Sequence, residues 1–349
     1  MNLPPPMPET VSPPPAPAAS RLHGAFTQLR DALSAEIVGQ AALVERLLIA
    51  LLADGHLLVE GAPGLAKTTA IRALASRLEA DFARVQFTPD LLPADLTGTE
   101  IWRPQEGRFE FVPGPIFHPI LLADEINRAP AKVQSALLEV MQERQVTIAG
   151  QTHVLARPFL VLATQNPIET EGTYALPEAQ VDRFMMKVVI GYPTEEEEFV
   201  IAERALAPAV AVLAVASTEQ LAALQKAARE VYVDPSLLQY AVRVVAATRN
   251  PGVYGLKDLA GAIACGASPR ATIALAQGAQ ALALMRGRNY VLLDDVKELA
   301  HDVLRHRITL SYEALADAQT PDRLIDQILV RIPAPARAPD VAAREERRA

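Results

Sequence analysis

A strand–loop–helix segment near residue 60 limits the possible folds most strongly. A short apolar run, His56–Glu60, leads into a loop that ends in Lys67 and Thr68, and a helical pattern follows. This is the context of a phosphate-binding loop, whose backbone N–H groups and helix N-terminus face a phosphate chain. Lys67 would reach the outer phosphates, and Thr68 would bind Mg²⁺ through its hydroxyl. The simpler alternative is an ordinary glycine-rich turn.

The loop departs from the motif G-x-x-x-x-G-K-[ST] at one position, where Ala66 replaces the second glycine. Alanine is acceptable there only if the backbone avoids positive φ. The positive charges of the site are unaffected. We therefore expect the nucleotide-binding residues of this segment to be Gly61, Ala62, Pro63, Gly64, Leu65, Ala66, Lys67, Thr68 and Thr69.

Apolar runs and helical patterns alternate up to Pro193. Continuous apolar runs of this length suit strands that helices cover on both faces, so the pattern predicts an α/β fold with a doubly wound parallel sheet. Two further stretches, Thr99–Phe117 and Gln145–Phe159, have the pattern of inserted β-hairpins. The expected strands are His56–Glu60, Phe82–Phe87, Ile120–Ala123, Phe159–Ala163 and Lys187–Ile190, and the expected helices between them are Lys67–Leu78 and Ala131–Gln142.

The strand signal fades after Pro193, which predicts a smaller all-α domain. Its expected helices are Thr194–Ala207, Thr218–Glu230, Pro235–Thr248, Pro269–Arg286 and Leu293–Leu304. Proline-rich ends have too little apolar surface to offset the entropy of ordering them. The expected organisation is a disordered tail (1–20), an α/β nucleotide-binding domain (21–193), an all-α lid domain (194–332) and a second disordered tail (333–349).

Two adjacent acids end the expected strand at residue 120. Asp124 could hold Mg²⁺ through its water shell, and Glu125 could polarise an attacking water. Taken alone, the two acids could equally be solvated or cap the following helix. The phosphate-binding loop upstream favours the catalytic interpretation.

Composition excludes several classes of protein. The net charge of −8, from 33 basic and 41 acidic residues, argues against a surface that grips nucleic-acid phosphates throughout. A single cysteine, Cys265, cannot form an intrachain disulfide, and the histidines lack metal-ligand spacing. Apolar runs fall short of the ~18 to 20 residues of a membrane span, and the N-terminus lacks a signal-peptide pattern. We expect a cytoplasmic protein.

Five segments in order resemble the motifs of the MoxR group of AAA+ ATPases. They are the loop at 61–68, Leu122–Pro130 (LADEINRAP), Ala163–Pro167 (ATQNP), Leu176–Phe184 (LPEAQVDRF) and Gly266–Ala271 (GASPRA). The resemblance covers about Ile37 to Arg307, and alanine at position 66 is usual in this group. It implies an AAA+ P-loop domain followed by a lid domain.

The resemblance also implies roles for individual residues. Asn166 would be the sensor-1 residue at the γ-phosphate, and Arg183 the arginine finger that reaches a neighbouring subunit's nucleotide. Arg270 would be sensor 2, which contacts the γ-phosphate of its own subunit. Gly39 and Gln40 would meet adenine through backbone groups. The alternatives are an Asx turn at Asn166, a surface salt bridge at Arg183 and an ordinary helix-start arginine at Arg270.

The implied function is hydrolysis of ATP with Mg²⁺ by a homo-oligomeric ring, expected to be a hexamer, since the finger acts between subunits. Partners carrying von Willebrand factor A domains and chaperone-like remodelling, complex assembly or metal-cofactor insertion would follow from the resemblance. Trp102, Phe109 and Phe111 would mark a substrate-facing hairpin or would pack it onto the sheet. The other candidate functions are a nucleotide-gated scaffold with little turnover and a nucleic-acid-directed motor, which the acidic balance disfavours.

Overall fold

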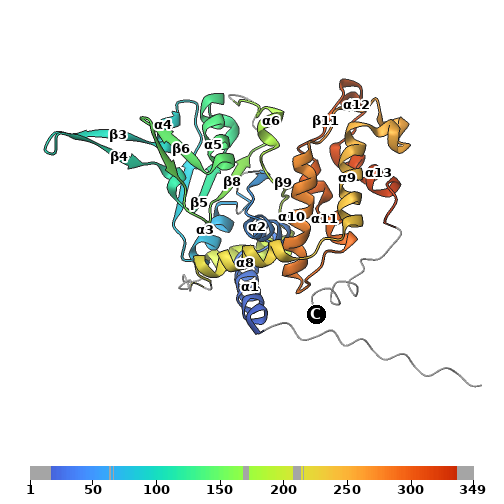
Figure 1. Ribbon diagram of the computed structural model, residues 1–349, viewed down its shortest axis with the longest axis horizontal. Helices are drawn as coiled ribbons and strands as arrows, with labels where there is room; N and C mark the ends of the chain where they lie inside the picture. Colours follow the sequence, from blue (N-terminus) through green and yellow to red (C-terminus); the bar gives the residue numbers. More distant parts are fainter. Residues whose placement is uncertain are drawn as a thin grey trace, which may run out of the picture.

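A five-stranded parallel sheet forms the centre of the N-terminal domain (Figure 1). The computed structural model describes residues 17–62, 64–65, 67–167, 173–206, 214 and 216–335. The strand order is β2-β5-β8-β1-β9. The strands are β1 (Leu57–Glu60), β2 (Phe82–Gln86), β5 (Ile120–Asp124), β8 (Leu160–Gln165) and β9 (Met186–Val189), each within two residues of the predicted bounds.

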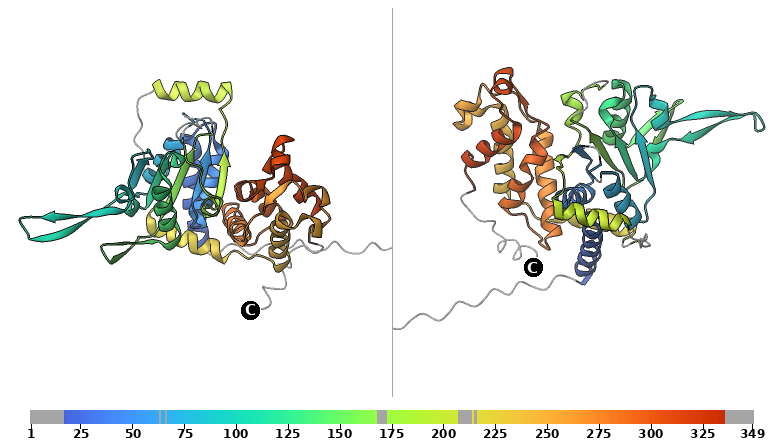
Figure 2. Two further views of the ribbon diagram at one scale, coloured as in Figure 1. Left: turned by 90° about the horizontal axis from the view of Figure 1, so that it is seen from above. Right: turned by 180° about the vertical axis from the view of Figure 1, so that it is seen from behind.

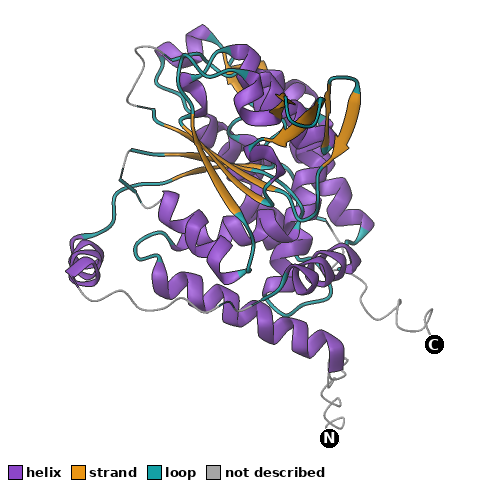
Figure 3. Cartoon of the chain, turned by 90° about the vertical axis from the view of Figure 1, so that its left-hand side faces the viewer, coloured by secondary structure: helices purple, strands orange, loops and turns teal. Residues whose placement is uncertain are grey.

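Helices cover both faces of this sheet (Figure 3). Side chains alternate between the faces along each strand. Leu57 and Val59 therefore join the core under the first three helices, whereas Leu58 joins the core under the helix Ala131–Glu143 (α5). The predicted doubly wound α/β fold is confirmed. The helices of this domain are α1 (Pro17–Glu36), α2 (Ala41–Leu52), α3 (Lys67–Arg77), α4 (Pro93–Thr97), α5 (Ala131–Glu143) and α6 (Glu178–Val181), with the 3₁₀ turns η1 (Pro115–Phe117) and η2 (Ile126–Arg128).

Two β-hairpins extend from the same side of the sheet (Figure 2, left), and both were expected. Each is an antiparallel pair joined by a tight turn. The rings of Phe111 and His153 stack with their centroids 4.3 Å apart, so the two hairpins contact each other at their bases. They consist of β3 (Gly98–Arg103) with β4 (Arg108–Pro113), and β6 (Gln145–Ile148) with β7 (Gln151–Val154).

The C-terminal domain is helical and packs beside the sheet (Figure 1). We expected an all-α domain, but the structure also has a short antiparallel strand pair there, in which β10 (Ile263–Cys265) pairs with β11 (Thr309–Leu310). Its helices are α8 (Thr218–Glu230), α9 (Pro235–Arg249), α10 (Pro269–Met285), α11 (Leu293–Leu304), α12 (Tyr312–Ala316) and α13 (Pro321–Arg331), with η3 (Pro251–Tyr254) and η4 (Lys257–Leu259).

Helix α7 (Glu195–Leu206) lies between the two domains in sequence and projects from the body of the molecule (Figure 2, left). It contacts the sheet domain through Arg204, which donates from Nη1 to the Ala35 carbonyl oxygen. Every residue of α7 is at least partly exposed. After α7 the chain returns across the sheet domain through α8, which packs against α1 and α2. Helix α11 packs against β9, which places the body of the helical domain beside this strand.

The first helix overlaps the segment that we expected to be a disordered tail. Helix α1 starts at Pro17, inside this expected tail of residues 1–20. Proline is tolerated there because the first turn of a helix needs no N–H from it. The remaining parts of the expected tails, residues 1–16 and 336–349, lie outside the described residues.

Two largely buried ion pairs join the helical domain to the sheet domain. Arg46 of α2 donates from Nε to Asp302 Oδ2 of α11 at 2.6 Å. Arg307, after α11, donates from Nε to Asp182 Oδ1 at 2.7 Å. Among the helices in the described ranges, none combines the length and the apolar character that a bilayer span requires.

Candidate nucleotide site

A cavity of about 470 Å³ opens at the carboxyl edge of the sheet. Because the strands are parallel, the residues that follow β1, β5 and β8 meet at this edge. The cavity thus collects the phosphate-binding loop, the acidic pair and Asn166, as the sequence motifs predict. Its expected lining residues are Gln40, Gly64, Leu65, Lys67, Thr68, Thr69, Asp124, Glu125 and Asn166; Glu36, Ile37, Val38, Arg84, Gln86, Pro193 and Ile201 complete it.

The loop after β1 is fixed by close packing at Gly61. A Cβ on this residue would lie 2.5 Å from Ile190 Cγ1, so only glycine fits against the end of β9. Gly64 has a φ of +82°, in the left-handed region that favours glycine. Helix α3 then begins at Lys67 with its N–H groups toward the cavity. Pro63 and Ala66 lie outside the described residues.

Lys67 is held at the mouth of the loop. Its Nζ donates to the Gly61 carbonyl oxygen at 2.7 Å. Burial lowers the pKa of Lys67, and the charges of Asp124, Glu125 and Glu60 act in the opposite direction. The ammonium therefore faces the acidic pair across the cavity that a phosphate chain would enter.

Asp124 is buried, and both of its carboxylate oxygens have partners. Thr164 Oγ1 donates to Oδ1 at 2.6 Å. Arg84 donates to Oδ2 from Nη2 at 2.8 Å and from Nε at 3.2 Å. A buried carboxylate requires such partners, because an unpaired one would carry a large desolvation cost.

Glu125 adopts an unusual backbone conformation, with φ 55° and ψ 51°. Non-glycine residues in this left-handed region carry strain, and such strain gathers at functional sites. The carboxylate accepts from Gln86 Nε2 at 2.8 Å and pairs with Arg128 Nε at 2.8 Å. It makes no hydrogen bond as a cap of η2, so the capping alternative does not describe it.

One end of the cavity is apolar and suits a flat base. Ile37, Val38, Pro193 and Ile201 line it beside Gln40. Gln40 is buried and donates from Nε2 to the Gly191 carbonyl oxygen at 3.0 Å. Gly39, with φ +74°, makes the turn that brings this segment against Pro193. Their contact with adenine stays a prediction.

A cation and a polyphosphate both match the donor chemistry of the cavity. Thr68 and Asp124 offer hydroxyl and carboxylate oxygens, which are the ligands that Mg²⁺ prefers beside water and phosphate. The helix N-terminus and Lys67 offer positive charge to an anion. The residues present therefore fit Mg²⁺ and a nucleoside triphosphate.

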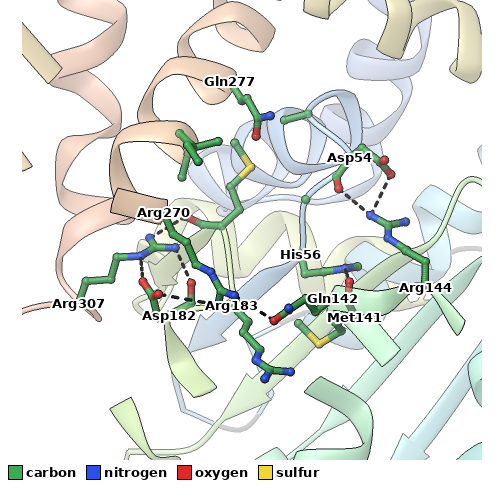
Figure 4. A pocket seen from close by; sticks show the side chains of 15 residues that line it. Asp54, His56, Met141, Gln142, Arg144, Asp182, Arg183, Arg270, Gln277 and Arg307 are labelled. Atoms are coloured by element: carbon green, nitrogen blue, oxygen red, sulfur yellow. Dashed lines mark hydrogen bonds and ion pairs between the residues drawn. The ribbon is translucent and has the colours of Figure 1, made fainter. Parts of the chain in front are cut away.

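Arg183 and Arg270 line a different cavity, of about 280 Å³ (Figure 4). Residues 53–56, which precede β1, also line it, so it lies at the amino edge of the sheet. Strand β1 has four residues, which at ~3.3 Å each separate the two edges by about 13 Å. The expectation that Arg270 contacts the phosphate of its own subunit does not fit this placement, because α10 packs beside the amino edge.

Both arginines are oriented by hydrogen bonds in this second cavity. Arg183 donates from Nη1 to the Leu138 carbonyl oxygen at 2.6 Å. Arg270 donates from Nη2 to Gln142 Oε1 at 2.9 Å and lies 3.9 Å from Asp182. Asp182 is instead bound by Ser268 and Arg307, so the surface salt bridge considered for Arg183 is not what holds it.

Sequence reasoning missed seven lining residues of the nucleotide cavity, and Arg84 and Gln86 are the two of them that bond to the acidic pair. They occupy alternate positions of β2 and therefore point to the same face of the strand. Polar residues at alternate positions of a predicted strand were the available signal. Their partners became visible only with the strand order, which places β2 beside β5.

Comparison with known proteins identifies related chains. Residues 56–186 match the family model "ATPase family associated with various cellular activities (AAA)", and residues 258–328 match "AAA lid domain". Chaperone MoxR1 of Mycobacterium tuberculosis is 51% identical over 86% of this chain and 79% of its own length. Protein MoxR of Paracoccus denitrificans is 35% identical over 90% of this chain and 97% of its own length. The solved structure of a candidate ATPase from Cytophaga hutchinsonii is 46% identical with a TM-score of 0.86, covering 90% of this chain and 96% of that one.

Proposed function

Because the chain belongs to the MoxR family of AAA+ ATPases, we propose that it hydrolyses ATP at sites shared between two copies of the chain. One observation carries the proposal. Lys67 and the acidic pair share the cavity at the carboxyl edge, whereas Arg183 and Arg270 share the cavity at the amino edge. A complete site needs both sets of residues, and two adjacent subunits can supply them.

The residues of the cavity at the carboxyl edge would bind the nucleotide and hydrolyse it. Lys67 and the N-terminus of α3 would bind the phosphates, and Thr68 and Asp124 would hold Mg²⁺. The metal would supply positive charge to the phosphate oxygens. Glu125 would orient and polarise the attacking water, with Asn166 beside it at the γ-phosphate.

The residues of the second cavity would act on the nucleotide of the adjacent subunit. A guanidinium that contacts the transferring phosphoryl group stabilises its negative charge. Arg183 suits this role because it borders an open cavity at the amino edge, and Arg270 lies beside it in Figure 4. Such head-to-tail contacts close into a ring, for which a homo-hexamer is the expected size.

Remodelling of a protein partner is the proposed use of the ATP energy. The name of the related Chaperone MoxR1 supports this proposal. The β3–β4 hairpin supports it too, because Trp102 and Phe109 are 49% and 63% exposed on an arm that projects from the domain (Figure 2). Phe111 packs against Phe117 and His153 at the base. Partners with von Willebrand factor A domains stay a prediction.

The hairpin charges disfavour the nucleic-acid alternative. Arg103 pairs with Glu110 and Arg108 pairs with Glu106, so these arginines are neutralised along the arm. A surface that binds phosphate backbones needs unneutralised cations. ATPase activity that DNA stimulates and salt suppresses would restore this alternative.

The deciding experiment is phosphate release by wild type, Glu125→Gln and the exposed control Glu139→Gln. We expect wild type and the control to turn over ATP. Glu125→Gln should retain nucleotide binding and lose turnover by about 100-fold or more, the range expected when a positioned general base is removed. Equal and negligible rates in wild type and Glu125→Gln would support the scaffold with little turnover instead.

A further inference from the structure

Arg84 binds the carboxylate that a metal ion in this cavity would also bind. Its guanidinium makes two hydrogen bonds to Asp124 Oδ2, and Thr164 binds the other oxygen of the same carboxylate. Asp124 is the carboxylate best placed to hold Mg²⁺ in this cavity. The positive charge that balances it in the structure therefore comes from the chain itself.

The geometry lets Arg84 leave without disturbing the fold. Strand β2 is at the edge of the sheet. The Arg84 side chain is 48% exposed, whereas the Asp124 side chain is 12% exposed. A half-exposed guanidinium can turn into solvent on its long flexible stem, while the carboxylate stays fixed by Thr164.

Departure of Arg84 would also reach Glu125. Nη2 of Arg84 donates to Gln86 Oε1 at 3.2 Å, and Gln86 Nε2 donates to Glu125 Oε2 at 2.8 Å. The three side chains line one wall of the cavity. A change at Asp124 is thus transmitted through two hydrogen bonds to the residue proposed to activate water.

We propose that Arg84 is a placeholder cation that balances Asp124 before Mg²⁺–nucleotide binds and is displaced when it binds. Its displacement frees Gln86 to release Glu125. Arg84 is a positioning residue in this scheme, because it acts through Asp124 and Gln86. The inference rests on the proposed function, since it requires that the cavity take Mg²⁺ with a nucleotide.

The test measures how strongly Mg²⁺ promotes nucleotide binding. The Kd of a fluorescent ATP analogue is measured in EDTA and in saturating Mg²⁺. The Kd in EDTA divided by the Kd in Mg²⁺ is then compared between proteins. Wild type must break the Arg84–Asp124 pair to accept Mg²⁺. Arg84→Gln has no such pair to break, and in EDTA its bare Asp124 repels the phosphates.

Both effects raise the ratio, so we expect an increase of about fivefold in Arg84→Gln, the scale of one partly exposed ion pair. Arg84→Lys keeps the charge without the forked geometry and should give a smaller increase. Arg72→Gln removes one charge from the exposed side of α3 and should match wild type.

An unchanged or lower ratio in Arg84→Gln would overturn the placeholder role. A lower ratio would mean that Arg84 assists the metal-bound nucleotide. Failure of wild type to bind the analogue in either condition would instead contradict the proposed function, so the two failures are distinguishable. Arg84→Lys keeps the test decisive if the glutamine variant is poorly folded.

Discussion

Arg270 Nη1 of the helical domain lies 3.9 Å from Asp182 Oδ2 of the sheet domain, one residue before Arg183. Asp182 also accepts from Ser268 and Arg307, both of which come from the helical domain. One carboxylate thus fixes the position of the helical domain and the orientation of the segment that carries Arg183.

Asp182 should be essential for stability as well as for position. The Arg307 side chain is 2% exposed, and Asp182 is the carboxylate that pairs with it. Asp182→Ala would leave a buried charge without its partner, which costs about 3 to 5 kcal/mol of unfolding free energy. Chemical denaturation measures this loss.

The control for that prediction is Asp326→Ala, which removes a 65% exposed carboxylate from its contact with His301. A surface pair of this kind contributes about 0 to 1 kcal/mol. Similar losses in the two variants would contradict the structural role of Asp182.

Lys67→Ala should abolish tight nucleotide binding. Charge-assisted hydrogen bonds to phosphate contribute about 1.5 to 3 kcal/mol each, so the affinity for an ATP analogue should fall by about tenfold to a hundredfold. Titration by fluorescence or calorimetry measures the change. The exposed control Lys132→Ala should bind like wild type. Equal affinity in wild type and Lys67→Ala would contradict the phosphate assignment of the cavity.

Buried histidine should make the fold sensitive to acid. His56 accepts from the Val161 N–H through Nδ1 and donates from Nε2 to the Met141 carbonyl oxygen. Burial, together with the charge of Arg144, lowers its pKa to about 3 from 6.5. Between these pH values the unfolded chain binds a proton that the folded chain lacks, so stability falls as the pH drops below 6.5.

The lowered pKa of His56 should reduce the free energy of unfolding by about 2 kcal/mol between pH 7 and pH 5. In His56→Asn the loss over the same interval should be smaller by that amount, although the variant is less stable at pH 7 because it loses the donor to Met141. His306, whose pKa burial also lowers, contributes equally to both proteins. Urea denaturation at the two pH values measures the difference, and parallel losses in the two proteins would contradict the prediction.

Much of the fold was readable because its signals are local. Continuous apolar runs such as Ile120–Ala123 mark strands buried on both faces, and the structure has β5 there. Parallel strands bring their carboxyl ends together, so the phosphate-loop motif and the acidic strand end together predicted that Lys67 and Asp124 converge. Both belong to one cavity in the structure.

The position of Arg270 could not be read in this way. It depends on how the helical domain packs, which is set by contacts far apart in sequence such as Arg46 with Asp302. The role of Arg84 was hidden for a related reason. Its partner Asp124 lies on the neighbouring strand, and strand order is a property of the whole sheet.

The most direct test of the shared site mixes two inactive variants, Arg183→Ala and Glu125→Gln. A site between an Arg183→Ala subunit that retains Glu125 and an adjacent Glu125→Gln subunit that retains Arg183 would be complete. We predict that each variant alone releases phosphate slowly and that mixtures recover activity, with a maximum near equal amounts. Mixed assemblies that show no recovery at any ratio would contradict the account.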